Sequence, residues 1–276
     1  MKVVVVYASS GTGHKKAAEA LVKAFKEHPD LNLRLIDSLD YTAPLFRFLY
    51  PRIYLFLVRY LPNVWGFFYD GLNVALIGPF LRRLRRLLNG MNGQALASFF
   101  LEEKPEVVVS THFFASEILS HLKRKGKLKT RLITVITDYV VHSVWVTSET
   151  DGYVVGAPET KMSLIRRKVP EENIHLFGIP VDPVFEEEKD RITLSRTLGF
   201  PLGRFTVLVA SGGFGVGPIE QLVVRLLQNE RLYLLVVCGH NRHLYERLKL
   251  RTMHALGRIA LFGFVNNMDA LMSVSD

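Results

Sequence analysis

The sequence contains a single cysteine, Cys238, among 276 residues. No disulfide and no thiolate zinc site can form within such a chain, and a reducing cytoplasm fits this composition. Long uncharged apolar runs are also missing, because the best candidate, residues 61–81, contains two prolines, an aspartate and several glycines. A transmembrane helix needs about 20 largely uncharged residues, so we expect none. The first apolar run, residues 3–7, is too short for a signal peptide.

Common ligand-binding signatures are scarce as well. The sequence has two glycine-rich segments, residues 9–14 and 211–217. Neither is followed by Gly-Lys-Ser/Thr, which excludes a Walker loop. The turn at residues 211–217 lacks the third glycine of a dinucleotide fingerprint. His112, Asp138 and His142 are too widely spaced to be strong candidates for zinc ligands.

Two glycine-rich turns dominate what is present. Residues 9–14 follow the apolar run 3–7, and residues 211–217 follow the apolar run 205–210. Each turn precedes an amphipathic segment, so each is predicted to join a strand to a helix and to direct backbone N–H groups at a ligand. Because the turns lie about 200 residues apart and each opens its own series of strands, we predict two doubly wound α/β domains with parallel sheets facing across a cleft.

The predicted domains differ in length. Strand-like runs at residues 31–36, 107–110, 132–137, 153–155 and 174–177 complete a first domain of residues 1–185. The segment 178–183 and the acidic run 186–190 are predicted to form a linker. A second domain, residues 191–276, has strand-like runs at 206–210, 232–237 and 259–262. Its length of about 90 residues is short of the ~150 that such a fold needs, so we expect it to be incomplete.

Positive charge is concentrated in one region. The chain has a formal net charge of +9, and residues 41–90 hold seven arginines and one aspartate among many aromatic residues. Prolines are expected to break this region into short helices, and residues 81–88 place leucines on one helical face and arginines on the others. We favour an anionic membrane surface as its partner over nucleic acid or a simple wetted surface. The candidate membrane residues are Trp65, Phe67, Phe68, Arg82, Arg83, Arg85 and Arg86.

His14 is the candidate catalytic residue. It directly follows Gly13 at the start of a predicted helix, where the helix dipole disfavours an imidazolium ion. A neutral imidazole can accept the proton of an attacking hydroxyl group. The alternative is an ordinary surface histidine at a helix start.

Further polar residues follow neighbouring predicted strands. His112 comes after the run 107–110, and Asp138, His142 and Trp145 come after the run 132–137. Since ligands of open α/β sheets bind at the carboxyl ends of the strands, these residues with Gly13 and His14 form a candidate acceptor pocket, in which Trp145 is able to stack on a sugar or line a lipid channel. Each of them alone is better explained as a capping or structural residue.

Three loops of the second domain form the candidate donor site. Small residues in the first loop allow the backbone to approach a diphosphate closely. Two further loops, residues 238–241 and 262–268, lie at the same predicted sheet edge. The candidate donor-binding residues are Ser211, Gly212, Gly213, Phe214, Gly215, Gly239, Asn241, Phe264 and Val265.

Together, these segments resemble the family of monogalactosyldiacylglycerol synthases and processive diacylglycerol glucosyltransferases. They are more distantly similar to the transferase that adds N-acetylglucosamine to the peptidoglycan lipid precursor. The segments are residues 9–14, 107–112, 137–145, 178–183, 211–217, 238–241 and 262–268. The resemblance implies a GT-B fold and a peripheral enzyme at the cytoplasmic face of the membrane. It further implies UDP-glucose or UDP-galactose as donor, diacylglycerol as acceptor, inversion at the anomeric carbon, and no cofactor or metal.

The resemblance also implies roles for positions. His14 matches the histidine that ends the family's first glycine motif, a base candidate near the acceptor hydroxyl. Residues 211–217 match the diphosphate-facing turn, residues 238–241 match a second donor-side loop, and Phe264 and Val265 match the place where the uracil ring is held. The family continues into a Gly-Gly-x-Thr turn that this sequence lacks. We therefore expect the chain as given to be a fragment with little or no activity.

Three other functions fit parts of the pattern. An N-acetylglucosamine transferase with an undecaprenyl-linked acceptor has the same architecture. A UDP-sugar epimerase does too, but has little use for the basic aromatic region 41–88. A membrane-binding module without catalysis would retain only the lipid contact.

Overall fold

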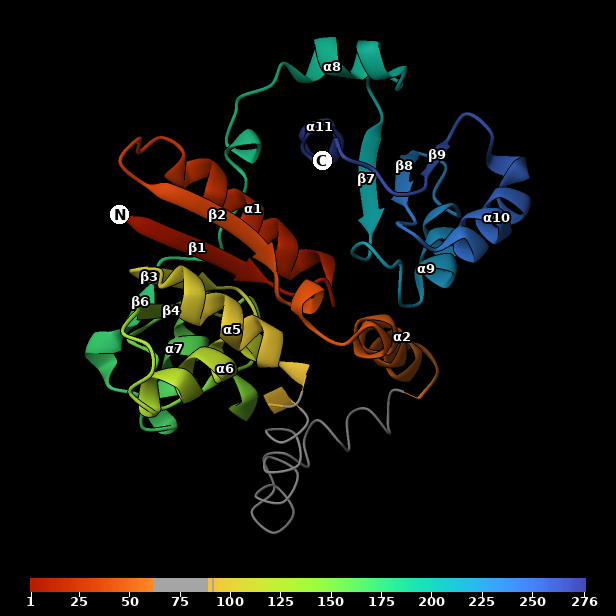
Figure 1. Ribbon diagram of the computed structural model, residues 1–276. Coiled ribbons are helices and arrows are strands. Elements are labelled where there is room, and N and C mark those ends of the chain that lie inside the picture. Colours follow the sequence, from red (N-terminus) through yellow and green to blue (C-terminus); the bar gives the residue numbers. More distant parts are fainter. Residues whose placement is uncertain (62–88, 91) are drawn as a thin grey trace. The chain divides into compact units, whose positions relative to one another are not determined.

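The computed structural model describes residues 1–61, 89–90 and 92–276. The chain forms two compact units, unit 1 (Met1–Pro183) and unit 2 (Val184–Asp276). Each contains one parallel β-sheet with helices packed on it (Figure 1). Parallel sheets in both units confirm the predicted fold class.

The sheet of unit 1 has six parallel strands in the order β2-β1-β3-β4-β5-β6. The chain runs from β1 to β2 on one side and then crosses to β3 on the other, so the switch point lies between β1 and β3. The strands are β1 (Lys2–Tyr7), β2 (Asn32–Asp37), β3 (Val107–Ser110), β4 (Arg131–Val135), β5 (Gly152–Val155) and β6 (Ile174–Leu176). Strand β4 ends two residues earlier than expected: Ile136 still donates a backbone hydrogen bond to the carbonyl oxygen of Val154 (2.9 Å), but Thr137 lies beyond the ladder.

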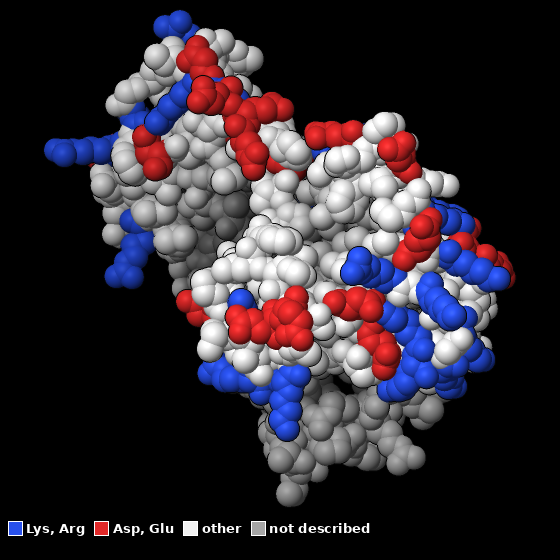
Figure 2. All heavy atoms as spheres, turned by 90° about the vertical axis from the view of Figure 1, so that its left-hand side faces the viewer, with Lys and Arg blue, Asp and Glu red and all other residues white. Residues whose placement is uncertain are grey.

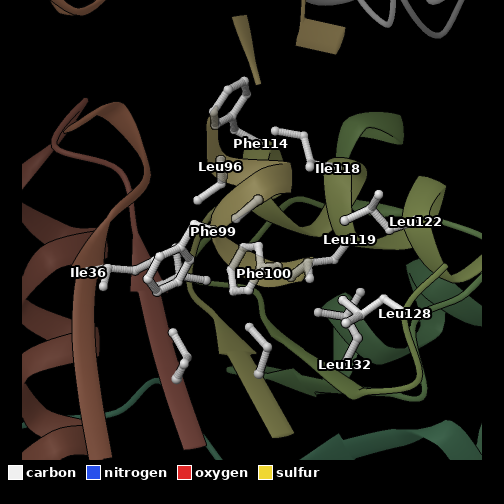
Figure 3. Packing of buried hydrophobic residues seen from close by; sticks show 14 residues of the cluster. Ile36, Leu96, Phe99, Phe100, Phe114, Ile118, Leu119, Leu122, Leu128 and Leu132 are labelled. Carbon is white, nitrogen blue, oxygen red and sulfur yellow. The ribbon is translucent and has the colours of Figure 1, made fainter. Parts of the chain in front are cut away.

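Helices cover both faces of this sheet. Val3 and Val5 face α1 (Thr12–Phe25), whereas Val4 and Val6 face the opposite layer, because successive side chains of a strand alternate between faces. That layer contains α5 (Gln94–Glu103) and α6 (Phe113–Arg124), whose leucine and phenylalanine side chains interlock over the strands (Figure 3). Unit 1 also contains helix α7 (Pro158–Arg166) and the short turns η1 (Ser38–Tyr41), η2 (Ser143–Trp145) and η3 (Glu171–Asn173).

Helix α2 (Pro44–Tyr60) follows η1. Pro44 occupies the first turn, where a missing N–H is tolerated, and the helix continues through position 51, so this proline does not break it as expected. A proline removes one backbone donor, yet the turns on both sides of it form. No helix in the described part of the chain has the length and hydropathy needed to cross a membrane.

Unit 2 has three parallel strands in the order β7-β8-β9. They are β7 (Phe205–Ala210), β8 (Leu232–Val237) and β9 (Ile259–Phe262). Helices α9 (Ile219–Leu226) and α10 (Arg242–Arg251) pack on one face, and α8 (Arg191–Leu198) and α11 (Met268–Ser273) pack on the other. The turns η4 (Pro183–Phe185) and η5 (Met253–Ala255) precede α8 and β9.

Charged side chains lie on the molecular surface. Figure 2 shows Lys and Arg gathered along one side of the face that it draws, with Asp and Glu between them. One concentrated source of positive charge was missed in the sequence, namely Arg124, Lys125, Lys127, Lys129 and Arg131, all exposed around the α6–β4 connection.

Candidate functional site

His14 lies in the first turn of α1, directly after the glycine-rich turn that follows β1. Its ring nitrogen Nδ1 is 2.9 Å from the carbonyl oxygen of Thr111 and 2.9 Å from the hydroxyl oxygen of Thr137. The Thr111 hydroxyl in turn donates to the carbonyl oxygen of His14 (2.9 Å). The loops that follow β1, β3 and β4 therefore meet at the imidazole of His14, at the switch point of the sheet.

The environment of His14 favours its neutral form. Burial lowers its pKa below the usual value, although the nearby Asp138 carboxylate and the hydrogen bond to Thr111 act in the opposite direction. Within the part of the chain that the structure describes, its second ring nitrogen, Nε2, has no hydrogen-bond partner. A neutral imidazole with a free nitrogen is suited to accept a proton near neutral pH.

His112 lies edge-on to His14, with ring centroids 4.8 Å apart, and is only 2% exposed. Its Nδ1 accepts a hydrogen bond from the backbone N–H of Phe114 (3.2 Å), so it caps α6. Since Nδ1 is an acceptor, the proton of the neutral ring is on Nε2, which donates to the hydroxyl of Ser10 (3.2 Å). His112 thus connects the start of α6 to the turn that carries His14. It is too deeply buried to contact an acceptor directly.

The pKa of His112 predicts a pH-dependent stability. Burial and then the neighbouring His14 hold this pKa well below the value of about 6.5 expected in the unfolded chain. Because the unfolded chain binds a proton that the folded chain excludes, the free energy of unfolding of unit 1 should fall as pH decreases below about 6.5, by at most about 1.4 kcal/mol per pH unit for this residue. Urea titrations from about pH 7.5 to pH 5 measure it. His112→Asn keeps a capping acceptor and should reduce the dependence of the free energy of unfolding on pH. An equal dependence in both proteins would mean that His112 is not its cause.

Asp138 and Trp145 form a pair beside His14. The indole N–H of Trp145 donates to a carboxylate oxygen of Asp138 (2.8 Å), and the Trp145 ring lies 6.0 Å from the ring of His14. Trp145 is 1% exposed and packs in a hydrophobic cluster with Ile136 and Tyr153. The expected stacking of Trp145 on a sugar or lipid is therefore not available in this structure, because the ring is enclosed in the core. It orients Asp138 instead.

The other predicted acceptor-side residues lie in the same loops. His142 is buried, and its Nδ1 accepts a hydrogen bond from the backbone N–H of Val144 (3.3 Å), so it caps η2. Gly13 is exposed, and a side chain at this position would meet no atom within 4 Å. The structure thus brings Gly13, His14 and Asp138 to the surface of one sheet edge, with His112, His142 and Trp145 buried beneath it.

In unit 2, the glycine-rich turn packs backbone to backbone against the loop that follows β8. A Cβ atom on Gly215 would lie 2.1 Å from the carbonyl oxygen of Cys238, and one on Gly239 would lie 2.3 Å from that of Gly213. Both glycines also have positive φ angles, of 55° and 58°. Only glycine combines this conformation with so close an approach. The two loops are therefore fixed to one another.

Polar groups strengthen this contact. The backbone N–H of His240 donates to the carbonyl oxygen of Gly213 (2.8 Å), and the side-chain amide of Asn241 donates to that of Gly215 (2.9 Å). Asn241 also accepts from the N–H of Leu244 (3.0 Å) and so caps α10. Its contacts within the described residues are structural.

The remaining predicted donor-side residues lie at the same edge of the sheet. The ring of Phe264, which is 43% exposed, stacks on the ring of His240 with centroids 4.3 Å apart. Val265 packs against the β9 side of the core. The hydroxyl of Ser211 donates to the carbonyl oxygen of Val216 and closes the first turn, where Gly212 is exposed and Gly213 and Phe214 are partly exposed.

The predicted membrane residues lie outside the described residues. They are Trp65, Phe67, Phe68, Arg82, Arg83, Arg85 and Arg86. The structure shows exposed apolar side chains on α2, a segment that was expected only to be part of a broken aromatic region. Within residues 1–61 and 92–276, no cluster of three histidine, cysteine or acidic side chains is arranged to hold a metal ion.

Known proteins show the same architecture. HepE of Anabaena, solved with UDP and glucose, superposes with a TM-score of 0.59 at 13% identity, over 100% of this chain and 72% of HepE. The UDP-GlcNAc 2-epimerase of Neisseria meningitidis, solved with UDP-GlcNAc, superposes with a TM-score of 0.52 at 13% identity, over 100% of this chain and 76% of the epimerase. Structural similarity at such low sequence identity shows the fold alone, and this fold is the predicted GT-B fold.

Sequence comparisons are more specific. The processive diacylglycerol beta-glucosyltransferase of Staphylococcus carnosus is 24% identical over 281 residues, which cover 99% of this chain and 68% of that relative. Residues 14–181 match the model of the monogalactosyldiacylglycerol (MGDG) synthase family. Since this match spans more than half of the sequence and includes every acceptor-side position from His14 to Trp145, the chain belongs to the MGDG synthase family.

Proposed function

We propose that this protein transfers glucose or galactose from a UDP-sugar to diacylglycerol, with inversion at the anomeric carbon. Membership of the MGDG synthase family supports the acceptor, as does the name of the Staphylococcus carnosus relative. The observation that carries the proposal is the imidazole of His14, held at the switch point of the sheet with Nε2 free.

In the proposed reaction, Nε2 of His14 accepts the proton of the acceptor hydroxyl while its oxygen attacks the anomeric carbon. A new carbon–oxygen bond forms, the bond to the diphosphate breaks, and the electron pair leaves with UDP. Attack from the face opposite the leaving group inverts the configuration. Asp138, oriented by Trp145, lies close enough to stabilise the imidazolium that forms.

The loops of unit 2 are the proposed donor site. Backbone N–H groups of residues 211–217 and of the following helix start are suited to the diphosphate, and Phe264 and Val265 are suited to the uracil ring. Backbone dipoles then compensate the phosphate charge, so this proposal includes no cofactor other than the donor and no metal ion.

We further propose that α2 rests on an anionic membrane at its cytoplasmic face, where diacylglycerol is found. Leu45, Phe48, Leu49 and Ile53 are exposed and follow helical spacing, so they form one apolar stripe. Arg52 lies within the stripe, with its guanidinium 3.6 Å from the centroid of the Phe48 ring, and Arg47 pairs with Asp40 (2.8 Å). The other side of α2 is anchored to unit 1, since the ring of Phe46 stacks 6.2 Å from that of Phe114. An exposed apolar stripe on a helix that also carries arginine is the pattern of an interfacial helix.

Replacing Phe48 and Ile53 together with serine should weaken binding to vesicles of anionic lipid about 10-fold or more, because each buried side chain contributes about 1.5–3 kcal/mol of transfer free energy. Sedimentation with vesicles at several lipid concentrations measures the change. Met162→Ser is the matched control, since Met162 is 51% exposed on α7 of the same unit. Binding that is unchanged in the double variant would exclude α2 as the membrane contact.

The function itself is tested with radiolabelled UDP-glucose, UDP-galactose and UDP-N-acetylglucosamine and with vesicles that contain diacylglycerol. The protein in these assays is fused to the carboxyl-terminal segment of the Staphylococcus carnosus relative, since the sequence lacks the Gly-Gly-x-Thr turn. Thin-layer chromatography should show a labelled hexosyl-diacylglycerol. Label appearing only on an undecaprenyl-linked acceptor would favour the N-acetylglucosamine transferase. Vesicle binding without transfer and without UDP binding by calorimetry would favour a membrane-binding module.

A further inference from the structure

Two oxygen atoms from different loops contact the same nitrogen of His14. The carbonyl oxygen of Thr111 follows β3, and the hydroxyl oxygen of Thr137 follows β4; each is 2.9 Å from Nδ1. A carbonyl oxygen can only accept a hydrogen bond, so Nδ1 must carry a proton for this contact to be favourable. We propose that the Thr111 carbonyl oxygen locks His14 in its Nδ1–H tautomer, and that Thr137 is a positioning residue for the base. This inference rests on the proposed function.

The lock matters because a neutral imidazole has one proton and two nitrogens. In water the Nε2–H form is preferred, and in that form the outward nitrogen cannot accept a proton. The hydrogen bond made by one ring nitrogen decides which tautomer is present. With Nδ1–H held by Thr111, Nε2 bears the free electron pair. The opposite tautomer would place a bare Nδ1 against the Thr111 carbonyl oxygen, which is repulsive.

Thr137 adds the second oxygen. With Nδ1 protonated, its hydroxyl is an acceptor, and the Nδ1–H group is shared between the two threonines. When Nε2 gains a proton, the ring becomes positive and its hydrogen bonds to both oxygens strengthen, because bonds from charged donors are stronger than neutral ones. Thr137 therefore stabilises the protonated base more than the neutral base. The edge-on ring of His112 restricts rotation of the His14 ring from another side.

The tautomer can be measured without catalysis. At about pH 8 the His14 ring is neutral, since burial lowers its pKa, and the nitrogen-15 shifts of its two nitrogens identify the protonated one. We expect Nδ1 to be protonated and Nε2 to be bare; the His14→Gln variant assigns the signals by their loss. An Nε2–H tautomer in the unaltered protein would overturn the inference.

The role of Thr137 is tested with Thr137→Val, which keeps the shape of the side chain but removes the oxygen. We expect kcat to fall about 10-fold with KM for the UDP-sugar unchanged, and the pKa of His14, followed by its nitrogen-15 shifts across pH, to fall because the protonated ring loses one acceptor. Thr137→Ser retains the hydroxyl and should restore both. Thr130→Val is the control for loss of a threonine hydroxyl, since Thr130 bonds the Glu106 carbonyl oxygen (3.3 Å) at the amino end of β4.

The outcomes separate the two proposals. If Thr137→Val leaves the pKa of His14 unchanged, or lowers kcat no more than Thr130→Val does, Thr137 is not a positioning residue. If the Nδ1–H tautomer is present but no hexose transfer to diacylglycerol is found with any donor, the proposed function fails while the tautomer assignment stands.

Discussion

Replacing His14 with alanine is expected to lower kcat for hexose transfer by about 10²-fold or more, with little change in KM for the UDP-sugar. The variant removes the nitrogen that accepts the acceptor proton, so a hydroxyl group has to attack without a base. The candidate donor loops belong to unit 2, whereas His14 belongs to unit 1, so we expect donor binding to persist. Initial rates with radiolabelled donor and diacylglycerol vesicles measure kcat, and calorimetry with UDP measures donor binding.

The pH profile sharpens this test. Because burial lowers the pKa of His14, the unaltered enzyme should lose activity only as pH falls below about 6.5, and the alanine variant should lack this acidic limb. His121→Ala is a matched control, since His121 also has a lowered pKa, caused by burial and nearby lysine and arginine residues, but lies on the last turn of α6. Full turnover in His14→Ala would remove this residue from the mechanism.

Much of the fold could be predicted from hydrophobic runs. The expected strands at residues 107–110, 232–237 and 259–262 coincide with β3, β8 and β9, because these short apolar runs are bounded by polar or glycine residues. The shared edge of the sheet followed from the order of strands and helices, since the carboxyl ends of parallel strands meet at one edge. His14, Asp138 and the glycine-rich turns could therefore be placed at sheet edges from sequence alone.

Contacts between side chains could not be predicted in this way. Residues 132–137 look like one uninterrupted strand, but β4 ends at Val135 and Thr137 is thereby free to reach His14. Trp145 was expected to stack on a sugar, because an indole ring with its N–H group is suited to that contact. In the structure the indole N–H donates to the Asp138 carboxylate, and the ring is buried in the hydrophobic core. Both outcomes depend on which loops lie side by side in the fold, and this cannot be predicted from the spacing of residues along the chain.

The close contact between the backbones of Gly215 and Cys238 in unit 2 could not be predicted from the sequence either. Gly215→Ala should destabilise unit 2 by about 2–4 kcal/mol: about 1–2 kcal/mol for a side chain at positive φ, and the rest for the clash with the Cys238 carbonyl oxygen. The same substitution should weaken UDP binding at least 10-fold, because the glycine-rich turn of residues 211–217 and the loop after β8 would move apart. Hydrogen exchange of the β7 and β8 amides measures the stability of this unit.

Gly212→Ala is the matched control for this variant. Gly212 lies in the same turn with nearly the same φ, 59° against 55°, but a Cβ atom there would meet no atom within 4 Å. It therefore has the conformational strain without the clash, and should destabilise unit 2 by only about 1–2 kcal/mol. The difference between the two variants isolates the contact between the loops. Equal destabilisation by both would mean that the close approach of Gly215 to Cys238 does not hold the candidate donor site together.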